Sequence, residues 1–266
     1  MVGTKRQGPL SKGMRLLAPV IAAFLWFCPA PAAAQDARHF STVVMVSADA
    51  EWKQVRRLFP KAHYLPQEFG EYFVRDPHTV VVQGGWGKIS AAASVQYAID
   101  RWKPDNIVNL GTCGGIQGRI ERYAIVAVTK TIVYDIVEQM GDADEAIGFY
   151  TTDIDLGWAG KPLPGSPTAT VLLSADRDLV PGDIARLVAK YDVRAVDWES
   201  GAIAWTARRN GKRVLILRGV SDLVSAESGG EAYGNLGTFE DGTGHVMQVL
   251  FEVLPAWLAL LDAGGR

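Results

Sequence analysis

Short apolar runs rich in β-branched residues recur along this chain, and several of them precede a turn and then a segment with helical spacing of its apolar residues. Such runs are typical of buried strands, and their alternation with helices indicates an α/β fold. The order of elements predicts a mixed, mostly parallel central sheet that helices cover on both faces. The predicted strands occupy residues 41–46, 79–83, 106–110, 124–130, 131–135, 168–174 and 214–217, and the last predicted helix occupies residues 245–260.

Residues 1–34 are predicted to be a secretory signal peptide. Four basic residues precede an apolar run at 16–27, which at about a dozen residues is shorter than the roughly 20 that span a bilayer. Consecutive alanines then offer a cleavage site before Gln35. Lipid attachment at Cys28 is the alternative, and the bulky phenylalanine before it disfavours this. We therefore expect a periplasmic or secreted chain with one domain, residues 35–266.

The composition after cleavage limits the kinds of partner, disulfide and metal site that we expect for the chain. Loss of four basic and no acidic residues would move the formal net charge from −2 to −6, which does not favour nucleic acid or an anionic membrane as a partner. Cys113 would be the one cysteine left, so no intrachain disulfide is expected. The four histidines lack the spacing of metal ligands, and no metal is expected.

Two acidic stretches indicate a site. Asp197 and Glu199 alternate with apolar residues before a run of small residues, so they should share one side of an extended segment that enters a helix. Ser221 and Asp222 lie just beyond the apolar run 214–217, at the carboxyl end of a predicted strand, where open α/β sheets bind ligands. Each pair alone could simply cap a helix. Together they predict one site with several carboxylates.

The same stretches carry a family resemblance. Residues 196–204, VDWESGAIA, and 218–222, RGVSD, resemble the V-[ED]-x-E-x-x-A-[IV]-A and R-x-[IV]-S-D signatures of the nucleoside phosphorylase superfamily, particularly of its 5′-methylthioadenosine/S-adenosylhomocysteine nucleosidases. Residues 85–92, GWGKISAA, are similar to the G-I-G-K-x-x-A-A of those nucleosidases, and residues 109–115, NLGTCGG, to N-x-G-[ST]-[AC]-G-G. The resemblance implies a three-layer α/β/α phosphorylase-like fold for residues 35–266, hydrolysis of the N-glycosidic bond of a purine nucleoside, and no organic cofactor.

The resemblance also implies a role for each site residue. Glu51, which follows the first predicted strand, would orient the attacking water, and Asp222 would protonate the departing purine. Asp222 must then hold a proton at neutral pH, which requires burial to raise its pKa. Ser221 would orient Asp222, and Glu199 would bind the ribose hydroxyls. The other substrate-binding positions in these motifs are Gly87, Thr112, Leu179 and Trp198.

The chain departs from the family pattern around the base. Asp178 stands where the family motif S-G-D-x-F-[IV] has an aromatic residue that stacks on the base, so we expect a different base pocket in which the Leu179 backbone still forms hydrogen bonds with the base edge.

The glycine-rich segment 227–244 is either a lid or a flexible insertion. The segment 138–165 is predicted to be a long loop over the site, with a disordered surface excursion as the alternative. Cys113 is interpreted as a packed small residue, not as a nucleophile.

Two other functions fit the sequence less well. A phosphorylase would need cations to clamp phosphate, and the family's phosphorylases have an early arginine that residues 46–51 lack. A non-catalytic nucleoside-binding protein that serves uptake would suit an exported chain, but it would not need the three carboxylates assigned above. The resemblance further implies a homodimer in which Trp86, Phe149 or Trp158 contributes to the site of the neighbouring subunit.

Overall fold

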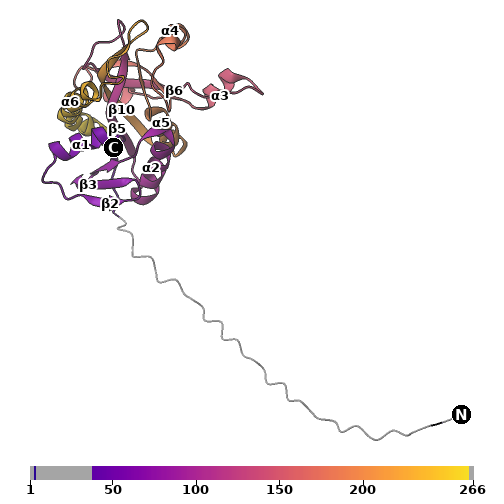
Figure 1. The fold of residues 1–266 in the computed structure, drawn as a ribbon. Coiled ribbons are helices and arrows are strands. Elements are labelled where there is room, and N and C mark those ends of the chain that lie inside the picture. The colour runs from indigo at the N-terminus through magenta and orange to yellow at the C-terminus, as the bar shows by residue number, and fades with distance from the viewer. Residues whose placement is uncertain (1–2, 4–37, 264–266) are drawn as a thin grey trace, which may run out of the picture. The chain divides into compact units, whose positions relative to one another are not determined.

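The computed structural model describes residue 3 and residues 38–263 (Figure 1). The predicted signal peptide and its cleavage site lie outside the described residues. The helices are α1 (Asp49–Leu58), α2 (Gly87–Trp102), α3 (Ala143–Phe149), α4 (Ile184–Tyr191), α5 (Ser200–Arg209) and α6 (Leu236–Ala263). The strands are β1 (Thr42–Val46), β2 (Leu65–Gln67), β3 (Gly70–Asp76), β4 (Thr79–Gln83), β5 (Asn106–Ile116), β6 (Ile125–Val133), β7 (Thr151–Asp153), β8 (Thr168–Ser174), β9 (Ala195–Asp197), β10 (Arg213–Ser225) and β11 (Gly229–Gly230).

The eleven strands of the described residues form one mixed sheet, as predicted. β4, β1, β5 and β10 run parallel, and the antiparallel strands β3 and β2 extend the sheet beyond β4. β10 also pairs antiparallel with β6, which pairs in parallel with β8, as β8 does with β9. Because β9 pairs antiparallel with β5, this part of the sheet closes on itself.

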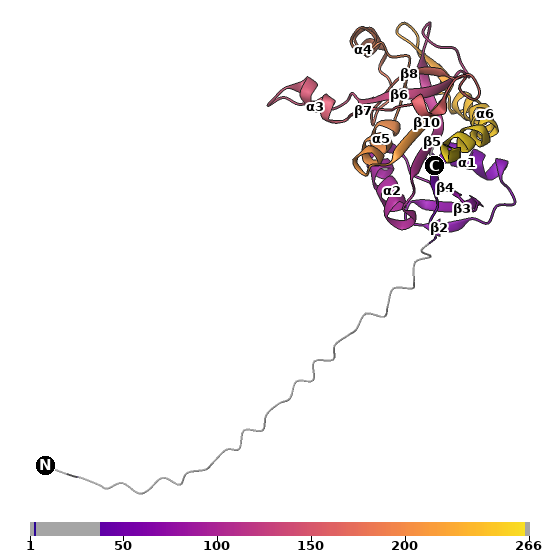
Figure 2. The same ribbon diagram turned by 180° about the vertical axis from the view of Figure 1, so that it is seen from behind.

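Helices cover both faces of the sheet, which confirms the three-layer prediction. Along β1, Val43 and Met45 pack in one apolar cluster with α2 and α5, and Val44 and Val46 pack in a second cluster with α1 and α6. Successive residues of a strand point to opposite faces, so a strand that is apolar at every position is stable only when both faces are covered. Figures 1 and 2 show these two helix pairs on opposite sides of the sheet.

The segment 138–165 differs from the prediction of a loop over the site. It forms α3, β7 and a 3₁₀ turn at Gly157–Ala159, and Phe149 packs against Trp205 of α5 with ring centroids 5.9 Å apart. Figure 1 shows α3 on an arm that projects from the body. The loop-over-site alternative is therefore wrong, because aromatic contacts hold the segment against α5 and away from the cavity described below.

The last helix begins at Leu236 instead of residue 245. Glycines at 237, 242 and 244 lower the helical propensity of this stretch by about 1 kcal/mol each. Gly242 lets α6 pass directly over β10, since an added Cβ would overlap the Ser221 carbonyl. Tertiary packing therefore overrides the low helical propensity of this stretch.

α6 is also long and apolar enough to cross a membrane, but its apolar residues form much of the core on this face of the sheet.

Candidate active site

The residues of the sequence motifs surround one cavity of about 730 Å³. It lies toward the carboxyl ends of β1, β5 and β10, where the sequence places the site. Gly87 reaches the site through an N–H group that donates to Glu199. The other predicted site residues line the cavity directly, namely Glu51, Thr112, Leu179, Trp198, Glu199, Ser221 and Asp222. The structure thus brings all of the predicted site residues together.

Glu51 lies in the first turn of α1, directly after β1, and is 1 % exposed. Its Oε1 accepts hydrogen bonds from the Thr112 N–H at 2.6 Å and the Thr112 hydroxyl at 2.9 Å. Its Oε2 accepts one from the Ala48 N–H at 3.2 Å. These donors fix the carboxylate in the cavity wall, where its remaining lone pairs can accept a hydrogen bond from a molecule in the cavity.

Arg218, to which the sequence argument gives no role, holds the carboxylates of the site together. It is fully buried, and its Nη1 lies 3.5 Å from Glu51 Oε1. Its Nη2 lies 2.8 Å from Asp197 Oδ2 and 3.8 Å from Glu199 Oε2. A signal for this role is present in the sequence, because a charged residue at the end of the apolar run 214–217 must be paired if the strand is buried.

The remaining donors of Arg218 are also satisfied. Its Nε donates to Ser200 Oγ at 2.9 Å, and its Nη2 donates to Asn109 Oδ1 at 2.8 Å. Asp197 is anchored in turn, because it accepts hydrogen bonds from Ser174 Oγ at 2.5 Å and from the Ser200 N–H at 3.0 Å. Such complete pairing is what a buried charge requires. The contacts indicate that Asp197 holds Arg218 in place.

Glu199 lies at the start of α5 and is 4 % exposed. Its Oε1 accepts a hydrogen bond from the Gly87 N–H at 3.0 Å. Burial raises the pKa of Glu199 to about 8; Arg218 opposes this shift, and Asp197 and Glu51 add to it. The environment of Glu199 therefore favours its protonated form. Hydroxyl donors that bind it would favour its ionised form.

Asp222 lines the same cavity and follows a bulge in β10 at Ser221. The Ser221 hydroxyl donates to Asp222 Oδ1 at 2.6 Å. Burial raises the pKa of Asp222; the Ser221 hydrogen bond and Arg122 oppose the shift, while Glu231 and Asp178 add to it. The environment of Asp222 thus favours its protonated form, as a proton donor requires.

Residues 42–180, more than half of the chain, match the family model described as the phosphorylase superfamily. The chain belongs to this superfamily. The 5′-methylthioadenosine/S-adenosylhomocysteine nucleosidase of Maridesulfovibrio salexigens is 29 % identical over 161 residues, which cover 56 % of this chain and 70 % of the relative. The enzyme of the same name from Bacillus licheniformis is 25 % identical over 173 residues, which cover 60 % and 75 % of the two chains.

Solved structures of the superfamily share the fold of this member. The 5′-methylthioadenosine nucleosidase of Arabidopsis thaliana, in apo form, matches with a TM-score of 0.66 at 20 % identity, over 82 % of this chain and 96 % of that one. The 5′-methylthioadenosine/S-adenosylhomocysteine nucleosidase of S. pneumoniae, with a transition-state inhibitor, matches with a TM-score of 0.65 at 19 % identity, over 83 % and 100 %. The phosphorylase-like fold class is therefore confirmed.

Several aromatic residues line the cavity of this superfamily member, and Asp178 lines it at the position where the motif resemblance leads us to expect an aromatic residue. Trp86 and Trp198 stack with ring centroids 4.8 Å apart and an interplanar angle of 29°. Tyr233 and Phe239, from the glycine-rich segment that the sequence leaves open, line another part of the wall. This segment is therefore part of the cavity.

Cys113 also lines the cavity, but its thiol is buried, with Sγ 3.6 Å from the Gly219 carbonyl oxygen. Burial raises the pKa of the Cys113 thiol, so the reactive thiolate is disfavoured and the interpretation as a packed residue stands. Within residues 38–263, no His, Cys, Asp and Glu side chains are grouped in threes as a metal site requires.

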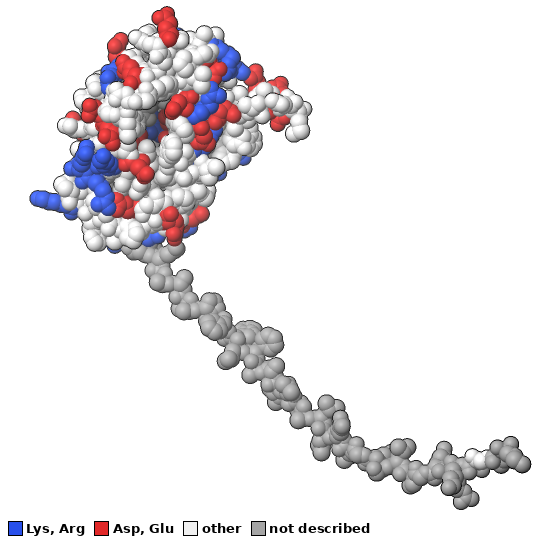
Figure 3. Space-filling view, in the orientation of Figure 1, with Lys and Arg blue, Asp and Glu red and all other residues white. Residues whose placement is uncertain are grey.

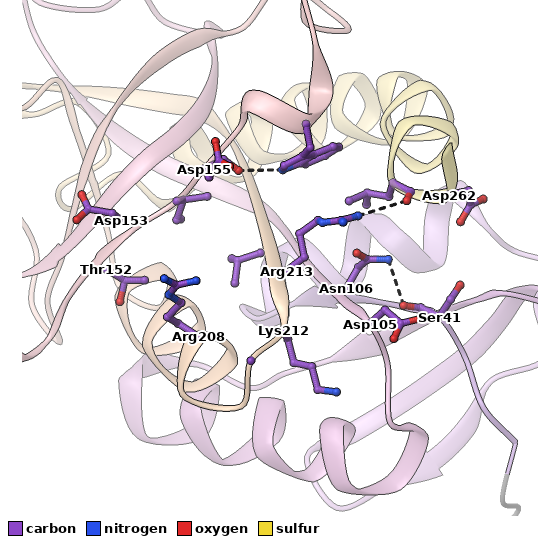
Figure 4. A pocket seen from close by; sticks show the side chains of 15 residues that line it. Ser41, Asp105, Asn106, Thr152, Asp153, Asp155, Arg208, Lys212, Arg213 and Asp262 are labelled. Atoms are coloured by element: carbon purple, nitrogen blue, oxygen red, sulfur yellow. Dashed lines mark hydrogen bonds between the residues drawn. The ribbon is translucent and has the colours of Figure 1, made fainter. Parts of the chain in front are cut away.

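A second cavity of about 690 Å³ lies at the opposite, amino-terminal ends of β5 and β10 (Figure 4). Arg213 lies over the Trp158 ring there, 5.6 Å from its centroid. Both acidic and basic residues line this cavity, and Figure 4 shows Asp155, Arg208 and Asp262 among them. Trp158, one of the aromatic residues predicted to reach the site of a neighbouring subunit, lines it. None of the residues predicted for the site of this chain itself does, so the first cavity is the candidate active site.

Proposed function

We propose that this chain is a purine nucleosidase that hydrolyses an N-glycosidic bond and releases free base and sugar, in the manner that the names of its relatives describe for them. One observation carries the proposal, namely the different environments of three carboxylates that line one cavity. Glu51 and Glu199 lie against the Arg218 guanidinium, whereas Asp222, with its raised pKa, accepts a hydrogen bond from the Ser221 hydroxyl. Three carboxylates in different environments can divide acid, water-orienting and binding roles.

The proposed mechanism assigns one step to each group. Asp222 donates its proton to N7 of the purine, so the base leaves as a neutral molecule while the sugar becomes oxocarbenium-like. A water that Glu51 orients attacks the anomeric carbon and transfers a proton to that carboxylate. Glu199 accepts hydrogen bonds from the ribose hydroxyls, and Ser221 keeps Asp222 oriented.

Two contacts favour water over phosphate as the nucleophile. The Thr112 N–H and hydroxyl, which a phosphate could otherwise use, both donate to Glu51. Arg218 is fully buried among carboxylates, and Arg177, which lines the cavity, pairs with Asp183 at 2.6 Å. Within the described part of the chain, the cavity therefore offers phosphate no cation that is not already paired.

The direct test incubates the pure protein with a panel of purine nucleosides, with and without phosphate, and separates the products by chromatography. Free sugar and base are expected even in excess phosphate. Asp222→Asn cannot deliver a proton and should lose about 10² to 10⁴ in turnover, and Glu51→Gln should also cut hydrolysis. Asp100→Asn, at an exposed position on α2, is the matched control and should behave as wild type.

Two outcomes would replace the proposal. Release of ribose 1-phosphate would establish a phosphorylase. Tight binding of nucleosides without cleavage of any of them would establish a binding protein linked to uptake.

Nucleic acid is not a partner in the proposal, and Figure 3 shows acidic and basic side chains interspersed over one face of the molecule.

The proposal extends to assembly and location. Large apolar side chains are exposed near the site and on the arm, with Ile89 85 %, Met140 97 % and Phe149 54 % exposed. Exposed apolar surface of this kind is typical of protein interfaces, and we propose a homodimer, which light scattering at assay concentration should detect.

We also propose that the protein is exported, because of the predicted leader. Amino-terminal sequencing of periplasmic protein should give a chain that starts near Gln35.

A further inference from the structure

The end of the cavity beside Asp222 is rich in hydrogen-bond acceptors. Asp178 lines this end, and no residue in the described part of the chain forms a hydrogen bond or ion pair with its carboxylate. Tyr233 lines it too, and its hydroxyl donates to the Leu179 carbonyl oxygen at 2.6 Å. Because tyrosine has a single O–H, its phenol oxygen then offers the cavity acceptor capacity alone.

Tyr233 is held in place by the turn that carries it. Its ring lies against the backbone of Gly230, where an added Cβ would come within 2.6 Å of two ring carbons. The next residue in the turn, Glu231, pairs with Leu223 of β10 twice: its N–H donates to the Leu223 carbonyl at 3.0 Å, and its Oε2 accepts from the Leu223 N–H at 3.0 Å. The phenol is therefore a fixed part of the cavity wall.

Asp178 gives this end of the cavity a negative charge. Asp178, Asp222 and Tyr233 line the same cavity, and the Asp178 carboxylate raises the pKa of both Asp222 and Tyr233. Glu231 does not line the cavity, and its carboxylate pairs with Arg122 at 3.7 Å. Arg177, the neighbour of Asp178 in sequence, does not neutralise it, because its guanidinium pairs with Asp183 at 2.6 Å. A base in the cavity can therefore meet the Asp178 carboxylate and the Tyr233 phenol oxygen as acceptors, and Asp222 is the acid that donates to it.

We propose that this end of the cavity recognises guanine, and that Asp178 and Tyr233 determine the preference. The proposal rests on the nucleosidase function proposed above. Guanine presents N–H donors at N1 and at its 2-amino group, side by side, and a carboxylate can accept both. Hypoxanthine has the N1–H without the 2-amino group. Adenine has a lone pair at N1, which a carboxylate repels.

The test compares kcat/KM for guanosine, inosine and adenosine in wild-type protein and in two variants. The expected order in wild type is guanosine, then inosine, then adenosine. Asp178→Asn keeps the shape of the side chain but loses its charge, so the ratio of guanosine to adenosine should fall about tenfold to a hundredfold, as expected for the loss of a charged hydrogen bond. Tyr233→Phe should lower the same ratio by a smaller factor. Tyr150→Phe, at a tyrosine outside the cavity lining, is the control and should leave it unchanged.

Binding gives a second measurement that does not depend on turnover. Calorimetry with the Asp222→Asn protein should show tighter binding of guanosine than of adenosine, and Asp178→Asn in that background should remove the difference. Cleavage or binding of adenosine at least as good as that of guanosine would overturn the guanine preference and leave the nucleosidase function intact. An equal loss of kcat/KM for all three nucleosides in both variants would also overturn the guanine preference, because it would assign Asp178 and Tyr233 a structural role. Absence of cleavage of every purine nucleoside would instead overturn the proposed function itself.

Discussion

Replacement of Arg218 by methionine tests the arrangement on which the site depends. The Arg218 guanidinium lies within 3.8 Å of carboxylate oxygens of Glu51, Asp197 and Glu199. Methionine keeps much of the apolar length of the side chain but has no charge and no donor. In the variant, the buried carboxylates would face one another without a cation between them.

The expected cost follows from these contacts. Removal of one partner from a buried ion pair lowers the free energy of unfolding by about 3–5 kcal/mol, mostly because the other charge stays buried and unpaired. The acceptors on Ser200 and Asn109 lose a donor as well, so the loss should lie toward the upper end of that range. Protonation neutralises buried carboxylates, so the loss should be smaller at pH 5.5 than at pH 8.

Urea unfolding followed by tryptophan fluorescence at both pH values measures this loss. The control is Lys53→Met, which breaks a pair with Glu240 at 3.4 Å whose side chains are 55 % and 47 % exposed. An exposed pair of this kind contributes about 0–1 kcal/mol. If Arg218→Met costs no more than the control at pH 8, or costs the same at both pH values, the claim that Arg218 holds the carboxylates together is refuted.

Three further predictions concern neighbouring groups. Glu231→Gln should lower the pKa of Asp222, because the Glu231 carboxylate raises it, and the fall in kcat/KM at high pH should move to lower pH in the pH–rate profile. Gly111→Ala should lower the melting temperature and the activity, since an added Cβ would overlap the Arg218 guanidinium, and overpacking of this kind costs about 1–3 kcal/mol or more. Glu199 has its pKa raised to about 8, so the folded state holds a proton that the unfolded state has released, and the free energy of unfolding should fall as pH rises toward 8. Glu199→Gln should reduce that slope in urea unfolding at pH 5.5 and 8.

The fold could be predicted from the sequence where local pattern and tertiary structure agree. Residues 79–83 and 168–174 are apolar runs with clear ends, and they are strands with those bounds. Predictions fail where long-range contacts decide the outcome. β5 continues through a glycine-rich stretch to Ile116 because β10 pairs with it along its whole length, and no local signal indicates that pairing.

The site could be predicted for a related reason. Glu51, Glu199 and Asp222 lie in sequence motifs, so the family resemblance predicts that they share one site. In the structure all three line one cavity. The charge balance among them could not be predicted in full, because Glu51, one of the carboxylates that Arg218 contacts, lies 167 residues from it along the chain. The Tyr233 contact with Leu179 could not be predicted either, because it joins the turn after β11 to the turn after β8.

The orientation of Asp222 depends on one extra residue in β10. Val220 pairs with Cys113 of β5 and Asp222 pairs with Gly114, so Ser221 has no partner of its own and forms a bulge. A shift of one residue moves the side chains of a strand to the opposite face. Without the bulge, Ser221 would take the register beside Gly114, and the carboxyl group of Asp222 would leave the face that it now shares with the cavity. The motif therefore identifies the acid, but the pairing of two distant strands is what turns it toward a substrate.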